Sequence, residues 1–465
     1  MEIKLRDYQS KIIGSLRNEI KNGSKRMLMV APTGAGKTIM FSFLVSEHIK
    51  RGGRVLVFTH RKELLKQAGG TFEKFGLTPE RITAGKFPSM KSNLHVAMIE
   101  TFARRIESYL SFLQSRTMII IDEAHLSTFE KVFPHFSENT LVIGATATPY
   151  RKGAKAKGLD EFYSAIVQEV DTPELISNGF LSPARTYAVK VDLSKAKKYG
   201  DDYDMSEYYK ENRMWHGVVR NWENIAKGTK TLLFSSNVEN SVKVAEEFNL
   251  MGYEARHIDG NTPGKIRDEI LDWFDKTRGA IVCNCGILNA GFDQSDIETV
   301  ILYRATTSLP LFLQMCGRGS RIHEGKTHFN ILDFGNNVHR MDFWEAPRIW
   351  SLKKDVTRSN KEDAMPIKIC KKCTAVVPVS TKVCPYCNTD FVKTKSEKIA
   401  ELELITSDEI KTAVAEGNFE TLELIAEAKG YHKRWVVHQI GRDVEKLKAY
   451  AAAKGYHQGW VHRQL

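Results

Sequence analysis

Short apolar runs alternate with stretches of helical periodicity along most of the chain. Residues 39–50 carry apolar side chains at spacings typical of an amphipathic helix. The shorter runs around this helix predict strands at residues 27–30, 54–58, 94–99, 117–121 and 141–144. Strands that alternate with helices in this way predict a parallel sheet.

The same alternation resumes after residue 182. It predicts strands at residues 183–192, 230–235, 253–258 and 280–283, and helices at 237–251 and 262–275. We therefore expect an α/β protein with two parallel-sheet domains in tandem, residues 1–178 and 179–350. The charged, tyrosine-rich stretch 195–210 is either a DNA-contacting insertion or a connector, and we favour the connector.

A phosphate-binding loop is expected between the first strand and the first long helix, where residues 31–38 read APTGAGKT. The backbone N–H groups of such a loop and the positive end of the next helix both face phosphates. Glycines let the backbone approach, the lysine charge reaches the β- and γ-phosphates, and the last hydroxyl is placed to bind Mg²⁺. Ala31 stands where the common pattern has glycine. The expected nucleotide-binding residues are Thr33, Gly34, Ala35, Gly36, Lys37 and Thr38.

Two acidic residues directly follow the apolar strand 117–121. We expect Asp122 to bind Mg²⁺ and Glu123 to orient and deprotonate the attacking water. His125 is expected to couple the nucleotide state to the other domain. Thr146 and Thr148 would bridge the acidic residues to the substrate side, or else belong to a solvated loop.

Gln9 lies just upstream of the phosphate loop, at the start of a predicted helix. Its amide both donates and accepts hydrogen bonds, which suits the adenine edge. The alternative is an ordinary helix start, and the neighbouring loop favours base recognition.

The sequences APTGAGKT, DEAH and GATATP, in this order, resemble the first motor domain of superfamily 2 helicases of the DEAH type. The LRDYQ start and the VFTHRKELLKQ stretch match the same family, and Arg6 joins Gln9 at the nucleotide by this resemblance. The resemblance covers roughly residues 5–335 and implies two RecA-like domains around one ATP site.

Residues 314–321, QMCGRGSR, resemble motif VI of these helicases. Arg318 and Arg321 are three residues apart, so we expect them on one helical face. The resemblance implies that Arg321 contacts the γ-phosphate, that Arg318 supports it, and that Gln314 belongs to the catalytic set. Arginine suits this task because its fork stabilises charge spread over several oxygens.

Other positions follow from the resemblance alone. Residues 284–293, NCGILNAGFD, are similar to motif V. There Gly291 permits a close approach of the backbone, and Asp293 contacts the nucleotide or the other domain. Arg61, Thr101 and Ser235 match positions that bind backbone phosphate, a contact that carries little sequence information.

The resemblance implies an ATP-dependent DNA helicase or translocase. Closure of the cleft on ATP and opening after hydrolysis would move the domains along a strand. The expected partner is single-stranded, forked or branched DNA, in replication, recombination or repair. An RNA helicase, a double-strand translocase such as a restriction motor subunit, and an ATP-switched DNA clamp are the alternatives.

Four cysteines form two CxxC pairs separated by ten residues, namely Cys370, Cys373, Cys384 and Cys387. Thiolates in this spacing predict a tetrahedral zinc site. Because a closed set of four leaves no position for water, we expect the zinc to be structural, in a ribbon spanning residues 365–392. Basic neighbours indicate either a DNA-facing ribbon or a module that the zinc merely stabilises.

The tail, residues 393–465, is expected to be helical and contains a repeat. The sequence AKGYHKRWV at residues 428–436 recurs at 453–461 as AKGYHQGWV. The repeated tyrosine and tryptophan are expected to pack a small module. Lys433 and Arg434 are candidates for DNA contact, and similar tails in phage and bacterial helicases of this group imply an accessory grip on DNA.

A formal net charge of +12 favours a polyanionic partner, with nucleic acid ahead of membrane. There is no apolar run of membrane-spanning length and no signal-peptide core at the start. We therefore expect a cytoplasmic protein with reduced cysteines, no membrane partner and a monomeric state.

Overall fold

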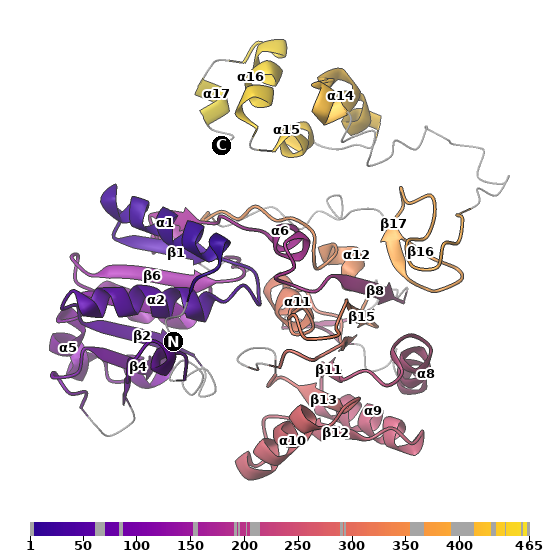
Figure 1. Ribbon diagram of the computed structural model, residues 1–465, viewed down its shortest axis with the longest axis horizontal. Helices are drawn as coiled ribbons and strands as arrows, with labels where there is room; N and C mark the ends of the chain where they lie inside the picture. Colours follow the sequence, from indigo (N-terminus) through magenta and orange to yellow (C-terminus); the bar gives the residue numbers. More distant parts are fainter. Residues whose placement is uncertain are drawn as a thin grey trace. The chain divides into compact units, whose positions relative to one another are not determined.

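The computed structural model describes residues 4–60, 70–82, 87–151, 157–189, 193, 196–200, 202–204, 214–288, 292, 294–353, 367–391, 413–428, 434–441, 443–456 and 459–462. The chain divides into two units, Met1–Ser359 and Asn360–Leu465. Two parallel sheets lie in the first unit (Figure 1), so the predicted fold class is confirmed.

Seven strands form the sheet of the first domain: β1 (Arg26–Val30), β2 (Val55–Thr59), β3 (Glu80–Ile82), β4 (Leu94–Met98), β5 (Met118–Asp122), β6 (Leu141–Thr146) and β7 (Ala165–Val167). Their order is β3-β4-β2-β5-β6-β1-β7, and every pairing is parallel. The inner strands are almost wholly buried, which explains their continuous apolar sequences.

The α-helices of this domain are α1 (Asp7–Lys21), α2 (Lys37–Lys50), α4 (Ile99–Ala103), α5 (Leu110–Gln114) and α6 (Thr172–Ser177). Single 3₁₀ turns lie at Ile106–Tyr109, Ser127–Lys131, Phe133–His135 and Leu159–Glu161. The amphipathic α1 buries Ile12, Ile13 and Leu16.

The second sheet has six strands: β8 (Ala184–Ala188), β11 (Thr231–Ser235), β12 (Ala255–Ile258), β13 (Ile281–Cys285), β14 (Thr299–Tyr303) and β15 (Phe329–Asp333). Their order is β12-β13-β11-β14-β15-β8, again all parallel. The helices are α8 (Met214–Ala226), α9 (Val238–Leu250), α10 (Gly264–Lys276), α11 (Leu309–Cys316) and α12 (Val338–Met341).

Part of the expected connector packs on the second domain. β9 (Lys198–Tyr199) and β10 (Asp202–Tyr203) form an antiparallel pair. The Asp202 carboxylate forms an ion pair with the buried Arg304 guanidinium. This part of the connector is therefore attached to the second sheet.

The segment after α12 returns to the first domain. The Gln168 side chain donates from Nε2 to the Arg348 carbonyl at 2.7 Å and accepts from the Trp350 N–H at 3.1 Å. The Leu352 carbonyl accepts from the N–H groups of Leu159 at 3.0 Å and Asp160 at 3.2 Å. Residues 348–352 thus join the two domains a second time, beyond the expected limit at residue 350.

The second unit contains a two-stranded ribbon, β16 (Ile367–Ile369) and β17 (Val376–Pro378). Its helices are α14 (Phe419–Ala428), α15 (Arg434–Ile440), α16 (Val444–Ala453) and α17 (Gly459–His462). Trp435 and Trp460 pack against a cluster of buried helix residues that includes Leu422 and Tyr450. These contacts favour the packing role predicted for the repeated aromatic residues.

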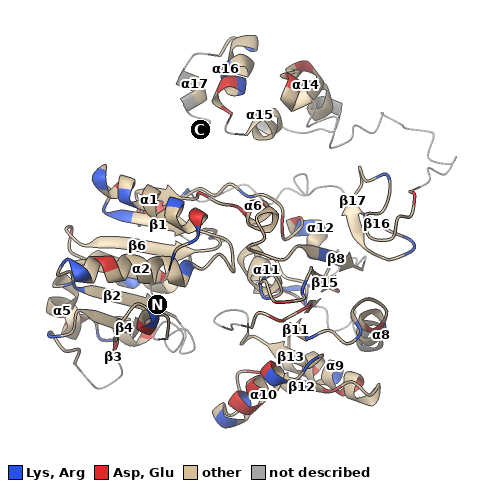
Figure 2. Cartoon of the chain, viewed as in Figure 1, with Lys and Arg blue, Asp and Glu red and all other residues tan. Residues whose placement is uncertain are grey.

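Basic and acidic residues are interspersed along α10 and α16 (Figure 2). The net positive charge is therefore not gathered on these helices. Within the described part of the chain, no helix combines the length and apolar character needed to cross a membrane.

Candidate functional site

The phosphate loop connects β1 to α2, and both of its glycines have left-handed backbone. The φ angle is 88° at Gly34 and 78° at Gly36, a region that other L-residues rarely adopt. The Lys37 ammonium crosses the loop and donates to the carbonyls of Ala31 at 3.1 Å and Pro32 at 3.3 Å. Lys37 begins α2, and the partly exposed Thr38 follows it at the end of the helix that attracts anions.

The start of α1 packs on this loop. The Tyr8 hydroxyl donates to the Ala35 carbonyl at 2.9 Å, and Gln9 Nε2 donates to the same oxygen at 3.2 Å. Gln9 Oε1 accepts from the Arg6 N–H at 3.0 Å, and the Arg6 guanidinium lies 4.9 Å from the centre of the Phe180 ring. Gln9 therefore supports the loop directly. Tyr8 was missed by the sequence reading.

The predicted acidic and coupling residues lie together at the ends of β5 and β6. Asp122 is the last residue of β5, and Glu123 has a positive φ of 51°, uncommon outside glycine. Burial and the Glu123 carboxylate raise the pKa of Asp122 to about 7. His125 Nδ1 lies 3.5 Å from Glu123 Oε2 and 2.9 Å from Thr146 Oγ1, which also accepts from the Thr148 N–H at 3.1 Å. A continuous polar path therefore connects Glu123 to Thr148.

Arg151 holds the turn that follows Glu123, and the sequence reading missed it. This buried guanidinium donates to the carbonyls of His125 at 2.8 Å and Leu126 at 3.1 Å. It also pairs with Glu130 at 2.8 Å. The available signal was an arginine three residues after Thr148, at the end of a strand that carries functional residues.

Arg318 and Arg321 do not share a helical face, so that prediction was wrong. Helix α11 ends at Cys316, and glycines on either side of Arg318 favour a turn instead. In this turn Arg318 Nη1 donates to the Phe292 carbonyl at 2.5 Å, and Arg321 Nη1 donates to the same oxygen at 3.3 Å. Gln314 lies on α11 and is partly exposed.

The turn at residues 317–321, which we call the arginine turn, packs directly on the phosphate loop. A Cβ atom added to Gly317 would lie 2.7 Å from the Thr33 Cβ. One added to Gly34 would lie 2.8 Å from Leu181 and 3.5 Å from the Ser320 hydroxyl. Only glycines allow this approach between the two domains.

Charges from both domains act on Lys37. Burial lowers the pKa of Lys37, and the carboxylates of Glu123 and Asp122 oppose that shift. The positive charges of Arg318 and Arg321 lower the pKa further. The structure therefore brings the predicted lysine, acidic pair and arginine pair into one site.

Four predicted residues lie outside the described residues: Arg61, Gly291, Asp293 and Lys433. Arg434 begins α15, but its side chain is likewise outside the description. Thr101 lies on α4 and is partly exposed.

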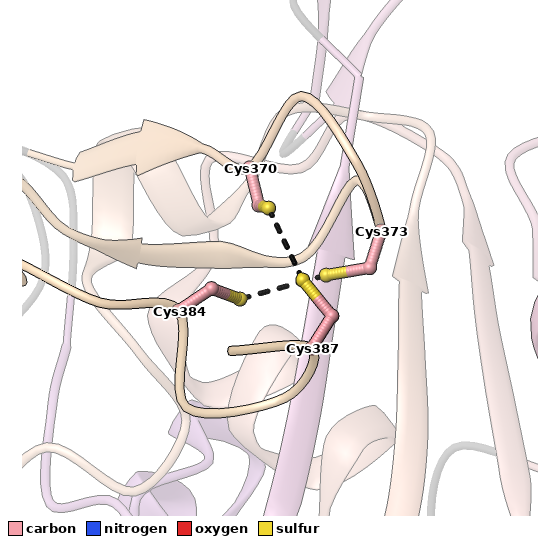
Figure 3. Close-up of side chains that lie close together, drawn as sticks. All are labelled: Cys370, Cys373, Cys384 and Cys387. Atoms are coloured by element: carbon pink, nitrogen blue, oxygen red, sulfur yellow. Dashed lines mark hydrogen bonds between the residues drawn. The ribbon is translucent and has the colours of Figure 1, made fainter. Parts of the chain in front are cut away.

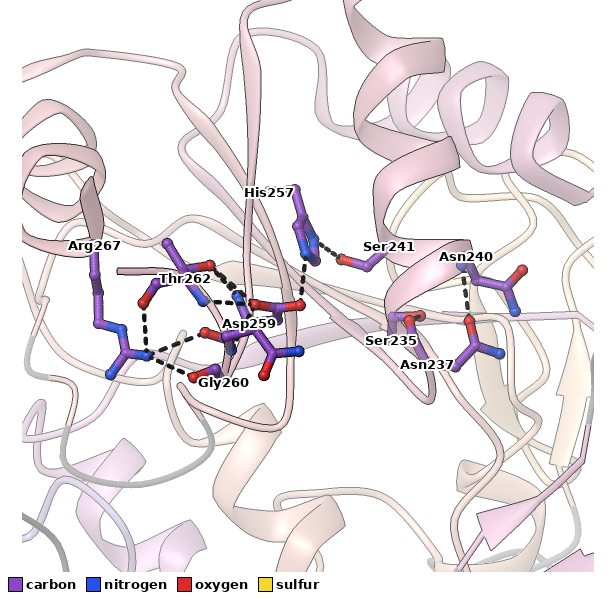
Figure 4. Close-up of polar contacts among 10 residues, drawn as sticks. Ser235, Asn237, Asn240, Ser241, His257, Asp259, Gly260, Thr262 and Arg267 are labelled. Atoms are coloured by element: carbon purple, nitrogen blue, oxygen red, sulfur yellow. Dashed lines mark hydrogen bonds and ion pairs between the residues drawn. The ribbon is translucent and has the colours of Figure 1, made fainter. Parts of the chain in front are cut away.

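Ser235 lies among polar loops at the ends of β11 and β12 (Figure 4). It is fully buried, and its hydroxyl donates to the Asn237 carbonyl at 2.9 Å. In the neighbouring loop, the Thr262 N–H donates to Asp259 Oδ1 at 2.9 Å, and Arg267 donates to the Thr262 carbonyl at 3.3 Å. These bonds fix both loops at the edge where ligands bind in open parallel sheets.

The four cysteines of the ribbon lie together (Figure 3). Their sulfur atoms lie within 4.8 Å of one another, and the pairs Cys370–Cys387 and Cys373–Cys384 are 3.6 Å apart. Sulfurs on a tetrahedral zinc ion are about 3.8 Å apart, because the Zn–S bond is about 2.3 Å long. The cluster therefore fits zinc.

Both cysteine turns have the same backbone arrangement. The N–H of Thr374 donates to the carbonyl of Cys370, and the N–H of Asn388 donates to that of Cys384, each at 2.9 Å. Thr374 and Asn388 both have a positive φ, 60° and 53°. Each turn thus presents two thiols from one side of a tight loop.

Two family models match the first unit of the chain. The "Type III restriction enzyme, res subunit" model matches residues 2–151, and the "Helicase conserved C-terminal domain" model matches residues 214–323. These ranges contain the phosphate loop with the acidic pair and the arginine turn, respectively.

Several proteins resemble the chain over most of its length. A 51.5 kDa protein of a Lactococcus phage is 29% identical over 90% of this chain and 89% of its own. A candidate ATP-dependent helicase of Saccharomyces cerevisiae, IRC3, is 32% identical over 76% of this chain, which spans 54% of the yeast protein. The Escherichia coli type I restriction enzyme EcoAI endonuclease subunit is 26% identical over 71% of this chain and 46% of its own.

The fold is also similar to that of a type ISP restriction-modification enzyme, LlaBIII, whose structure was solved bound to DNA. The TM-score is 0.56 at 20% identity, over 71% of this chain and 27% of that enzyme. The first unit is therefore similar to the motor domains of superfamily 2 helicases, and the relatives of the chain include a phage protein, a yeast helicase candidate and a restriction-enzyme subunit.

Proposed function

We propose that this protein is an ATP-dependent DNA helicase or translocase, acting as a monomer on single-stranded, forked or branched DNA in replication, recombination or repair. The contact between the arginine turn and the phosphate loop is the observation that carries the proposal. It supports a nucleotide site shared by Lys37 and Arg321 of different domains, in which hydrolysis would change what joins the domains. We place the motor domains at residues 1–178 and 179–350, the ribbon at 365–392 and the helical module at 393–465.

Each residue of the site has a proposed role. Lys37 binds the β- and γ-phosphates through its ammonium group. Glu123 orients the attacking water and accepts its proton. Arg321 stabilises the charge that develops on the γ-phosphate, and Arg318 supports it.

Magnesium fits the oxygen ligands that the site offers, the Thr38 hydroxyl and the Asp122 carboxylate, and it would neutralise phosphate charge there. Arg6 and Gln9 form the adenine side of the site. Four further residues complete the nucleotide-binding set or the catalytic set: Gln314, Gly291, Asp293 and Thr33.

Coupling to DNA is proposed to run along the path from Glu123 through His125 and Thr146 to Thr148. Loss of the γ-phosphate changes the charge beside Glu123, and the neighbouring His125, Thr146 and Thr148 then respond. The predicted contacts to the DNA backbone are Arg61, Thr101, Lys433 and Arg434. Ser235 does not fit this role, because it is fully buried and its hydroxyl is bonded to the Asn237 carbonyl.

A double-strand DNA translocase resembling a restriction motor is the second candidate. Its support is the similarity to the EcoAI subunit and the fold shared with LlaBIII. Such a motor would move along duplex DNA without separating the strands.

Strand displacement separates these candidates. We expect the full chain to release a labelled strand from forked DNA when ATP is present, and not from an RNA duplex. A duplex translocase would instead displace a third strand from blunt triplex DNA. Binding to all DNA substrates without any ATP-dependent displacement would contradict both candidates.

Zinc is the proposed occupant of the cysteine cluster, where it would stabilise the ribbon. We expect Cys384→Ser to lose the equivalent of zinc that elemental analysis finds in the wild-type protein, because three thiolates leave an open coordination position. The matched control is Cys283→Ser, which replaces a buried cysteine outside the cluster. A wild-type protein purified without chelators and free of zinc would contradict the proposal.

A further inference from the structure

We propose that Lys326 is a positioning residue for ATP hydrolysis, because its ammonium group fixes the backbone of the arginine turn. This inference rests on the proposed role of Arg321 in the same reaction. Lys326 lies in the loop between the arginine turn and β15, five residues after Arg321.

The Lys326 ammonium faces three carbonyl oxygens, one for each of its N–H groups. It donates to Gly319 at 2.6 Å, to Arg321 at 2.8 Å and to Ser295 at 3.2 Å. Two of these carbonyls belong to the arginine turn, and one of them is the carbonyl of Arg321 itself. The Lys326 side chain therefore binds the backbone of the turn at the residue that carries the Arg321 guanidinium.

Ser182 and Phe329 also restrict the position of the arginine turn. The Ser182 N–H donates to the Ser320 carbonyl at 2.7 Å, and its hydroxyl donates to the Arg321 carbonyl at 3.2 Å. A Cβ atom added to Gly319 would lie 2.3 Å from the Phe329 ring. Ser182 and Lys326 thus both bind the Arg321 carbonyl, and Phe329 packs against Gly319.

Position matters here because the arginine turn also touches the phosphate loop. A misplacement of about 1 Å in a positioning element can lower a rate by about 10²-fold. Removing the ammonium would leave the carbonyls of Gly319 and Arg321 with fewer donors. The guanidinium of Arg321 would then lose its fixed approach to the γ-phosphate.

The surroundings of Lys326 make this contact sensitive to pH. Burial lowers the pKa of Lys326 to about 8, opposed by the carboxylates of Glu298 and Asp296 and assisted by the charge of Arg321. Of the two neighbouring histidines, His323 bonds to Ser295, and His328 has a pKa lowered by burial. Because the ammonium form makes all three bonds, the contact weakens as pH rises through about 8.

The test compares Lys326→Met with Lys230→Met in the full chain. Lys230 is another lysine of the second domain, and it donates to the Asp275 carbonyl and Asp296 without contacting the arginine turn. We expect Lys326→Met to lower kcat for ATP by about tenfold to hundredfold with KM changed less than about threefold. Lys230→Met should reduce thermal stability while kcat stays close to that of the wild type.

The pH dependence of kcat separates a loss of this contact from general destabilisation of the fold, which would not change it. The kcat of the wild type should fall as pH is raised from 7 to 9, with a midpoint near 8. Lys230→Met should show the same fall at a higher pH, because it leaves the Asp296 carboxylate near Lys326 without its lysine partner. Lys326→Met should lack this fall. A Lys326→Met protein with wild-type kcat and an intact alkaline fall would overturn the inference, as would an equal loss of kcat in Lys230→Met. A different result would contradict the proposed function, namely normal ATP turnover by Arg321→Ala.

Discussion

Arg321→Ala is expected to lower ATP turnover by about 10³–10⁵-fold while ATP affinity changes only a few-fold. The guanidinium belongs to a turn packed on the phosphate loop, and its proposed role is to stabilise negative charge that develops mainly in the transition state. Its loss should therefore appear in kcat. Single-turnover hydrolysis and nucleotide binding, measured on the same protein, separate the two effects.

Arg278→Ala is the matched control for this result, because Arg278 is exposed in the same domain. It should hydrolyse ATP at the wild-type rate. An Arg321→Ala protein with normal turnover would exclude Arg321 from the reaction and remove the basis for a site shared between the domains.

Lys37→Ala is expected to lower ATP turnover by at least about 10²–10³-fold and to weaken ATP binding as well. In the proposed role, the Lys37 ammonium binds the phosphates in both the ground state and the transition state, so KM and kcat should both change. DNA binding without nucleotide should persist, since Lys37 lies inside the phosphate loop. Filter binding of labelled DNA checks that second expectation.

Lys50→Ala provides the comparison at the opposite end of α2, where the lysine is exposed. It should behave as the wild type in both assays. If Lys37→Ala turned over ATP normally, residues 31–38 would not form the hydrolytic site.

The sequence predicted the central strands of the fold well because parallel strands are buried on both faces. The apolar run 117–121 corresponds to β5, which extends to Asp122. The run 141–144 corresponds to β6, which extends to Thr146. In β5 the polar Asp122 ends the apolar pattern while the ladder continues, since Asp122 still pairs with Ala145. In β6 the small residues Gly144 and Ala145 weaken the pattern before the strand ends at Thr146. The functional residues therefore belong to the strand ends that hydropathy leaves out.

The phosphate loop was predictable because its chemistry is local in sequence. Arg151, Lys326 and the bond between Gln168 and Trp350 were not, because their partners are mostly backbone carbonyls or amides, and those of Arg151 and Gln168 are 26 and 182 residues away. A carbonyl is present at every residue, so the sequence contains no mark of which one a side chain will bind. The helical face proposed for the two arginines failed for another reason, the glycines that end α11.

We propose that one ATP site, built by both motor domains, is coupled to DNA. The most direct test measures ATP hydrolysis by the full chain, Lys37→Ala and Arg321→Ala, with and without forked DNA at fixed salt. We expect forked DNA to raise the wild-type rate at least about tenfold and both variants to stay near background with DNA bound. Two results would contradict the claim: a wild-type rate that forked DNA does not change, or hydrolysis near the wild-type rate by either variant.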